Sequence, residues 1–203
     1  MTRATATILY SFTSVTFILL LCPLLLAAGC GPRPDAITYT AVDLTRTLDS
    51  AERRPATGFD VGVRAAEGVS RPSIVMPVPA RATWLLPLPR HGVFRAFVTL
   101  DPAGTPATAV RFRLGISDNR VYEGLADRTL TVERGWTEIR ADLSAYAGRK
   151  WSLFYRPDQI VWRLVLSTDA LGPVPTHAIW GSPEILTDVA SANEYLIRRR
   201  QMH

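Results

Sequence analysis

The chain has 203 residues, of which 47% are hydrophobic and 20% charged, a composition typical of a globular protein rather than a disordered one. Its formal net charge is only +5, and no basic run accompanies a nucleic-acid-binding motif, which argues against a nucleic-acid partner. Fifteen prolines and thirteen glycines predict many turns and little helix.

The N-terminal segment carries one charged side chain, Arg3, followed by an apolar run over residues 8–28. Its length would allow an uncleaved membrane anchor. The short cationic start and the small residues at its end favour a cleaved signal peptide over residues 1–29 instead. The segment Leu26-Ala27-Ala28-Gly29-Cys30 resembles the lipobox of bacterial lipoproteins, with Ala27 where leucine is commoner.

The lipobox resemblance implies cleavage before Cys30 and lipidation of its thiol, with residues 30–36 as a tether. Several acyl chains hold a protein firmly to a bilayer, so the expected location is the cell envelope. Gly31, rather than aspartate, follows the cysteine, which in a Gram-negative cell implies transfer to the outer membrane. Cys22 would be removed with the signal peptide, and the thiol of Cys30 would carry the lipid. The remaining domain could then form no disulfide, and its stability would depend on its hydrophobic core.

The pattern after the tether predicts one β-rich domain over residues 37–187, with a short helix expected first at Asp43–Arg54. Alternation of apolar and polar residues then predicts half-buried strands, and prolines push the segment Ile74–Leu88 to an edge or bulge. A helical tail over residues 188–203 follows. The strands are expected at Ile74–Leu88, Val93–Leu100, Val110–Ile116, Arg128–Glu133, Trp136–Leu143, Trp151–Arg156, Val161–Thr168 and Thr176–Leu186.

The order of these segments and two motifs, DLSAYAG at 142–148 and HAIWGSP at 177–183, resemble the jelly-roll, galactose-binding-like domains of secreted bacterial proteins. They are similar to carbohydrate-binding modules of the NPCBM type and to accessory β domains of sulfatases. The resemblance spans residues 71–186 and implies an all-β jelly-roll sandwich that binds carbohydrate without catalysis. Tyr146 and Trp180, within the motifs, are expected in the core.

No catalytic set is recognisable in the sequence. The histidines have no metal-ligand spacing, and there is no nucleophile elbow, P-loop or dinucleotide fingerprint. We therefore predict no enzyme, no metal and no cofactor, and no calcium site because no dense run of oxygen ligands is visible. A carboxylate pair for glycoside hydrolysis stays open as a third hypothesis, with five candidates: Asp118, Glu123, Asp127, Glu133 and Glu138.

Strand alternation places several arginines on the outside of the predicted sandwich. One outer sheet face is expected to carry them, and guanidinium forks suit the carboxylate, sulfate or phosphate groups of an acidic polysaccharide or lipopolysaccharide. Trp84 and Trp136 are candidate exposed sugar platforms. Simple pairing of the arginines with Glu133 or Glu138 is the alternative. The predicted ligand-binding residues are Arg95, Phe97, Arg111, Arg113, Arg163 and Trp136.

Two function hypotheses remain open beside the hydrolase. The first is a membrane-anchored extracytoplasmic lipoprotein that binds polysaccharide. The second is a structural or assembly lipoprotein that docks a protein of a cell-surface polysaccharide or envelope system. Arg198–Arg200 complement the dipole of the predicted C-terminal helix, and a contact with anionic lipid or a partner is their alternative role.

Overall fold

The computed structural model describes residues 37–101, 109–131, 135–147, 162–172 and 177–201, and Ile37–His203 form one compact unit. Cys30, with the signal segment, and the strand expected at Trp151–Arg156 lie outside the described residues. Among the helices of this described part, none has the length and apolar character needed to cross a bilayer.

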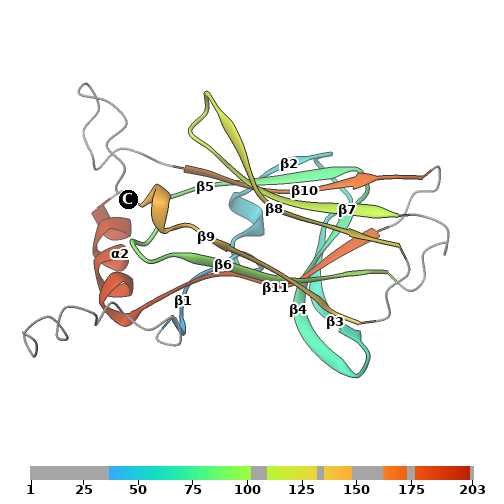
Figure 1. The fold of residues 1–203 in the computed structure, drawn as a ribbon, viewed down its shortest axis with the longest axis horizontal. Coiled ribbons are helices and arrows are strands. Elements are labelled where there is room, and N and C mark those ends of the chain that lie inside the picture. Colours follow the sequence, from blue (N-terminus) through green and yellow to red (C-terminus); the bar gives the residue numbers. More distant parts are fainter. Residues whose placement is uncertain (1–36, 102–108, 132–134, 148–161, 173–176, 202–203) are drawn as a thin grey trace, which may run out of the picture. The chain divides into compact units, whose positions relative to one another are not determined.

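Two antiparallel sheets make up the described part of the chain (Figure 1). The six-stranded sheet has the order β3-β4-β11-β6-β9, with β1 beside β11. Its strands are β1 (Tyr39–Asp43), β3 (Asp60–Ala66), β4 (Val69–Pro77), β6 (Val93–Leu100), β9 (Thr137–Asp142) and β11 (His177–Thr187). The five-stranded sheet has the order β2-β5-β10-β7-β8. Its strands are β2 (Glu52–Arg54), β5 (Ala80–Leu86), β7 (Val110–Ser117), β8 (Tyr122–Leu130) and β10 (Trp162–Ala170).

The core forms between the two sheets because each strand turns alternate apolar side chains inward. Trp180 of β11 is fully buried, with its ring edge-on to Phe94 of β6 and Phe112 of β7 at centroid distances of 6.5 and 5.4 Å. Tyr146 packs in the same manner on Trp162, at 5.3 Å. The predicted jelly-roll β-sandwich is thus confirmed, as are the core positions of Trp180 and Tyr146.

One helix and one short helical turn close the end of the sandwich shown at the left of Figure 1. The C-terminal helix α2 (Val189–Gln201) confirms the helical tail and buries Ala192 and Tyr195. The 3₁₀ turn η3 (Ser144–Tyr146) follows β9, where the Asp142 carboxylate accepts the backbone N–H of Ser144 at 2.8 Å.

The helix expected at Asp43–Arg54 is wrong. Strand β1 ends at Asp43, a single 3₁₀ turn η2 (Leu48–Ser50) follows, and β2 begins at Glu52 in the other sheet. The segment crosses between the sheets, with Leu44 and Leu48 buried in the core, and the Asp43 carboxylate accepts the Thr45 N–H in a local turn that competes with helix.

Two further expectations about strands change, and one about an exposed side chain. The proline-rich segment Ile74–Leu88 holds parts of two strands, β4 and β5, rather than one. Strand β8 begins at Tyr122, six residues before the predicted start at Arg128. Trp84 is not an exposed platform, because its ring is 1% exposed and its indole N–H donates to the Thr47 carbonyl at 3.1 Å.

Candidate functional site

The expectation that one outer face collects the predicted ligand-binding residues is wrong. Arg95 and Phe97 lie on β6, and Trp136 directly precedes β9, all in the six-stranded sheet. The three other arginines, on β7 and β10, lie in the five-stranded sheet: Arg111, Arg113 and Arg163. The alternation was correct for each strand, but alternation does not say which sheet a strand joins.

The outer face of the five-stranded sheet is rich in arginine. Because Ala82, Phe112 and Leu164 point into the core, the residues that alternate with them point outward. Strand register places five arginines against three carboxylates on this face: Arg54, Arg81, Arg111, Arg113 and Arg163 against Glu52, Asp127 and Asp169. The face therefore carries an excess of positive charge.

Only part of this charge is neutralised within the face. Glu52 pairs with Arg54 at 2.7 Å and more loosely with Arg163 at 3.5 Å, and Arg113 contacts Asp169 at 2.7 Å. The side chain of Arg113 is 39% exposed, and its Nε is buried without a partner in the described part. The side chain of Arg163 is 36% exposed as well, so an anionic ligand can reach both guanidinium groups, on β7 and β10, despite their ion pairs.

Tyr122 lies among these arginines, with 46% of its surface exposed. From β8 its side chain crosses to β7, so that the hydroxyl end of the ring covers the Cα of Gly115. A Cβ at Gly115 would lie 2.3 Å from the Tyr122 Cζ, so only glycine admits the ring there. The ring thereby lies along the sheet surface, between the β7 positions of Arg113 and Ser117.

A tight turn fixes the approach to Tyr122. The Asp118 carboxylate accepts the backbone N–H groups of Arg120 and Val121, both at 2.9 Å, and Asn119 adopts a positive φ of 78°. The hydrogen bond from Val121, and then that from Arg120, lower the pKa of Asp118 below its usual value. The carboxylate therefore acts as a fixed turn acceptor at neutral pH.

The outer face of the six-stranded sheet has a different organisation. The Arg71 guanidinium lies over the Phe97 ring, 3.4 Å from its centroid, and 5.8 Å from the ring of Trp136. The Trp136 indole N–H donates to the Val69 carbonyl at 2.8 Å. A Cβ at Gly181 would lie 2.7 Å from the Trp136 ring, so the indole rests on the backbone of β11.

Charges on this face also have internal partners. Both Nε and Nη2 of Arg95 donate to one Glu184 oxygen, at 3.2 and 2.6 Å, and the Thr40 hydroxyl donates to the other at 2.7 Å. Burial lowers the pKa of Arg71, and the charge of Arg95 lowers it further, against opposing effects from nearby carboxylates. The aromatic rings and arginines predicted here are already engaged with one another.

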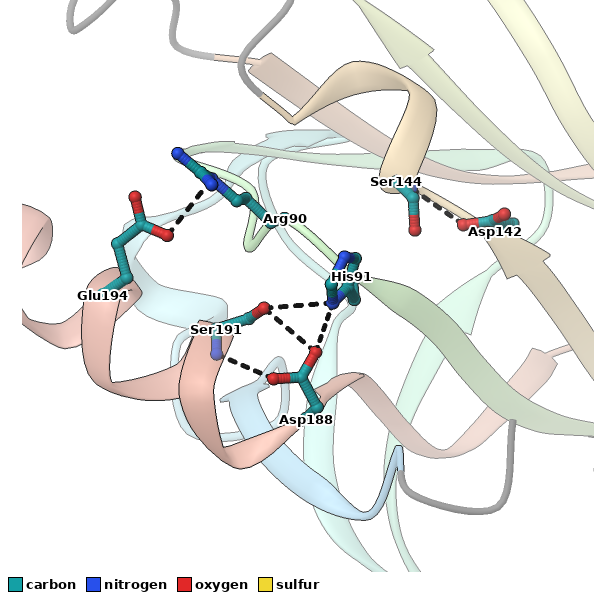
Figure 2. Close-up of polar contacts among 7 residues, drawn as sticks. All are labelled: Arg90, His91, Asp142, Ser144, Asp188, Ser191 and Glu194. Atoms are coloured by element: carbon teal, nitrogen blue, oxygen red, sulfur yellow. Dashed lines mark hydrogen bonds and ion pairs between the residues drawn. The ribbon is translucent and has the colours of Figure 1, made fainter. Parts of the chain in front are cut away.

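A serine, a histidine and an aspartate meet where α2 begins (Figure 2). Asp188 Oδ2 lies 2.5 Å from His91 Nδ1 and accepts the Ser191 hydroxyl at 3.0 Å, while Ser191 Oγ lies 3.3 Å from the same His91 nitrogen. A catalytic triad needs serine and aspartate on opposite nitrogens of the imidazole. This cluster instead caps the helix, because Asp188 Oδ1 accepts the Ser191 N–H at 2.8 Å.

The same cap joins the helix to the strand connection before β6. Arg90 adds an ion pair with Glu194 on α2, at 3.2 Å (Figure 2). Within the described ranges, no three His, Cys, Asp or Glu side chains lie close enough together to hold a metal ion. The polar cluster therefore fastens α2 to the sandwich.

The two residues that distinguish the faces, Arg71 and Tyr122, are not among the ligand-binding residues predicted from the sequence. Arg71 belongs to β4, but it lies beside Pro72, and a proline argues against a regular strand in the sequence. Tyr122 lies before the alternating stretch from which β8 was predicted. The pairing of β8 with β7 is irregular opposite Leu114 and Gly115, so the alternation does not extend back to Tyr122. The available signal was the pair of glycines, Gly115 and Gly124, which face each other across β7 and β8.

Comparisons with known proteins find likeness in structure alone. No family model matches the chain, and no curated protein matches it either. Among solved structures, it is similar to the CBM51-2 and INT domains of ZmpB from Clostridium perfringens, with a TM-score of 0.46 at 12% identity over 67% of this chain. The chain spans 29% of the length of that structure.

Two further structures are similar in size. One is the CBM22-1 xylan-binding domain of Xyn10C from Paenibacillus barcinonensis, with a TM-score of 0.43 at 14% identity over 69% of this chain and 87% of the other. The other is TmCBM61 in complex with β-1,4-galactotriose, with a TM-score of 0.45 at 9% identity over 74% and 100%. What this chain binds has to be inferred from its own surface.

Proposed function

We propose that this chain is a non-catalytic carbohydrate-binding lipoprotein of the cell envelope. Its ligand lies on the outer face of the five-stranded sheet, across Tyr122. The observation that carries the proposal is the Tyr122 ring, which lies over Gly115 with 46% of the residue exposed, on a face with arginines in excess.

The ring offers a stacking surface for a sugar. Aromatic side chains present a large apolar face, and the C–H groups of a pyranose present a matching one. Gly115 lets the ring lie against the sheet instead of standing away from it. Along β7, the distance from Ser117 to Arg111 is about 20 Å, at about 3.4 Å per residue, which suits an extended chain rather than a single sugar.

The arginines favour an acidic polysaccharide. Arg111 and Arg113 lie on β7, the strand that the Tyr122 ring covers. Arg163 lies on β10, in register with Ser117 of β7 and Tyr122 of β8. Guanidinium groups donate paired hydrogen bonds to carboxylate or sulfate groups. A neutral glycan would use the ring but not the excess charge.

The test is calorimetric titration of residues 31–203 with neutral and acidic bacterial polysaccharides. We expect binding to acidic glycans, a loss of about tenfold or more with Tyr122→Ala, and weaker binding with Arg111→Ala plus Arg113→Ala. Tyr39→Ala is the matched control, because Tyr39 is 41% exposed on β1 of the other sheet. Arg46→Ala serves in the same way for the arginines, since its side chain is 84% exposed.

Two outcomes would contradict this site. Equal losses from Tyr39→Ala and Tyr122→Ala would place the ligand elsewhere. No binding to any glycan, by protein whose circular dichroism shows it to be folded, would favour the alternative of an assembly lipoprotein that docks an envelope protein. Cross-linking in cells would then identify the partner.

The membrane attachment in this proposal rests on the lipobox-like segment before Cys30. Cys30→Ser should abolish acylation and leave the signal segment uncleaved, which mass spectrometry of the N-terminus would detect. Cys22→Ser is the control and should change neither. Acylation that persists in Cys30→Ser would contradict the anchor, while the carbohydrate site would stand unaffected.

A further inference from the structure

The six-stranded sheet ends at β3, which has β4 on one side and no other strand beside it among the described residues. Val61 and Val63 on this strand are 46% and 67% exposed. They point to the inner side of the sheet, as does Ile74 opposite Val61 on β4, but only Ile74 is buried. Among the described residues, β3 thus combines a backbone edge without a neighbouring strand with uncovered apolar side chains, which natural proteins usually avoid.

The other four edge strands lack this combination. β1 has five residues, and its pairing with β11 shifts register between Thr40 and Val42. β2 has only three residues, and the pairing of β8 shifts register opposite Leu114 and Gly115. β9 lies alongside β8 of the opposite sheet, and its central apolar residue, Ile139, is 1% exposed. Short length, irregular pairing and cover are the usual protections of a sheet edge, and β3 has none of them.

The hairpin between β3 and β4 fixes which backbone groups face outward. Its two turn residues, Glu67 and Gly68, have φ values of 47° and 78°, as a type I′ turn requires. The two residues that flank the turn, Ala66 and Val69, form a hydrogen-bonded pair, so the backbone N–H and C=O groups of Ala66 point toward β4. Bonded and non-bonded pairs alternate in antiparallel strands, so the N–H and C=O groups of Val61 and Val63 point away from β4.

These outward groups are complementary to the same strand of a second copy. If two β3 strands run antiparallel with Gly62 opposite Gly62, Val61 exchanges backbone hydrogen bonds with the second copy's Val63. The valine side chains then cover one another across the junction. A two-fold axis repeats each of these contacts, as in the closed interfaces of most homodimers.

The charges on β3 agree with the same register. Asp60 comes to lie opposite the second copy's Arg64, at positions where cross-strand side chains approach most closely. Within one chain, Arg64 folds back over Gly62 to reach Asp60 at 2.6 Å, and its Nη1 donates to the outward carbonyl of Val63 at 3.2 Å, a bond that the N–H of the second copy's Val61 would replace. Both charges are therefore already at this edge, where their side chains are 38% and 63% exposed.

We propose that β3 is a self-association edge, through which two copies of this chain join antiparallel about Gly62 into one continuous sheet. The strand has seven residues, so the interface is small and the dimer is weak and concentration-dependent. The proposal is independent of the carbohydrate-binding function, because it uses an edge of the six-stranded sheet and not the face that carries Tyr122.

Charge reversal tests the register directly. Asp60→Arg places arginine opposite arginine across the junction, and Arg64→Asp places aspartate opposite aspartate. Each variant alone should self-associate about tenfold or more weakly than the natural chain, because both symmetric pairs become repulsive. An equimolar mixture of the two variants should associate at least as tightly as the natural chain, because every pair is then opposite in charge. Sedimentation equilibrium of the full chain in a neutrally buoyant detergent measures all three.

A matched control reverses the pair on β2, with Glu52→Arg and Arg54→Glu, which should leave the natural dissociation constant unchanged. Val63→Lys, which adds a charge at the junction without touching the ion pair, should also weaken association. A natural chain that is monomeric at about 1 mM, or a mixture that associates no better than either variant alone, would overturn the proposal. So would equal effects of the β2 and β3 reversals.

Discussion

On the outer face of the six-stranded sheet, the Arg71 guanidinium covers the Phe97 ring, whereas on the five-stranded sheet Tyr122 is 46% exposed. Both faces combine an aromatic ring, arginines and a glycine beneath a ring. On the first face, Trp136 is the second ring. Its indole N–H donates to the Val69 carbonyl, and the ring lies on the backbone at Gly181. The same residue types thus form packing on one face and an accessible surface on the other.

The difference follows from what each ring can reach. Trp136 bridges from the start of β9 to β4, so moving it breaks a hydrogen bond and uncovers the sheet. Tyr122 lies on an edge strand behind an exposed turn, and no hydrogen bond to its hydroxyl is recorded among the described residues. A ligand therefore competes with protein contacts for the rings of the first face, whereas at the exposed part of Tyr122 on the second face it displaces water.

Matched alanine substitutions at the two glycines should separate the faces most strongly. Gly181→Ala sets a Cβ 2.7 Å from the Trp136 ring and 3.0 Å from Arg71 Cδ, and should lower the free energy of unfolding by about 1–3 kcal/mol. Gly115→Ala displaces only the exposed end of Tyr122, and should cost less than about 1 kcal/mol while weakening glycan binding. Urea unfolding and calorimetry give both quantities, and equal stability losses would contradict the comparison.

Removing an arginine from each face gives a smaller contrast. Arg71→Ala should cost about 1–2 kcal/mol, because it removes a partly buried cation–π contact and uncovers two rings. Arg113→Ala should stay within about 0.5 kcal/mol, since Asp169, its partner, is 39% exposed and remains hydrated. A larger loss of stability from Arg113→Ala than from Arg71→Ala would reverse the assigned roles.

The sequence was sufficient for the parts of the fold that local periodicity controls. β6 spans Val93–Leu100 as predicted, and the inward positions of Phe112, Leu164 and Trp180 follow from alternation. Period two gives the side of a strand but not its sheet, so Arg95 and Arg113 could not be assigned to different faces. The crossover at Leu44–Leu48 looked helical because its two apolar residues are four apart, although they reach the core from a turn.

Salt should act on the two faces in different ways. Between 50 and 500 mM NaCl, glycan affinity should fall about three- to tenfold, because the arginines around Tyr122 are solvent-exposed and their attraction is screened. The free energy of unfolding should change little, since the Arg71 contacts are partly buried. Titrations at three salt concentrations test this, and salt-independent affinity for an acidic glycan would leave the arginines without a role.

The smallest effect is expected at the helix cap, which belongs to neither face. Burial alone would raise the pKa of Asp188, but the hydrogen bonds from Ser191 and His91 lower it below its ordinary value. A lowered carboxyl pKa stabilises the fold above the unfolded pKa of about 3.9, and this contribution is lost as the pH falls through the folded pKa. Asp188 should therefore support the fold at neutral pH and not in acid.

Asp188→Asn keeps one side-chain oxygen for the Ser191 N–H and replaces the charged Oδ2, which faces His91 and the Ser191 hydroxyl, with an NH2 group. At pH 7 it should lower the free energy of unfolding by less than about 1 kcal/mol, and the difference from the natural chain should begin to shrink below about pH 4 and continue to fall as the pH passes through the folded pKa. Urea unfolding from pH 3 to pH 7 measures this, and Asp49→Asn, at an exposed position of the turn η2, is the matched control. A difference that persists undiminished at pH 3 would show that the cap acts through its geometry, and that the charge on Asp188 adds nothing to the attachment of α2.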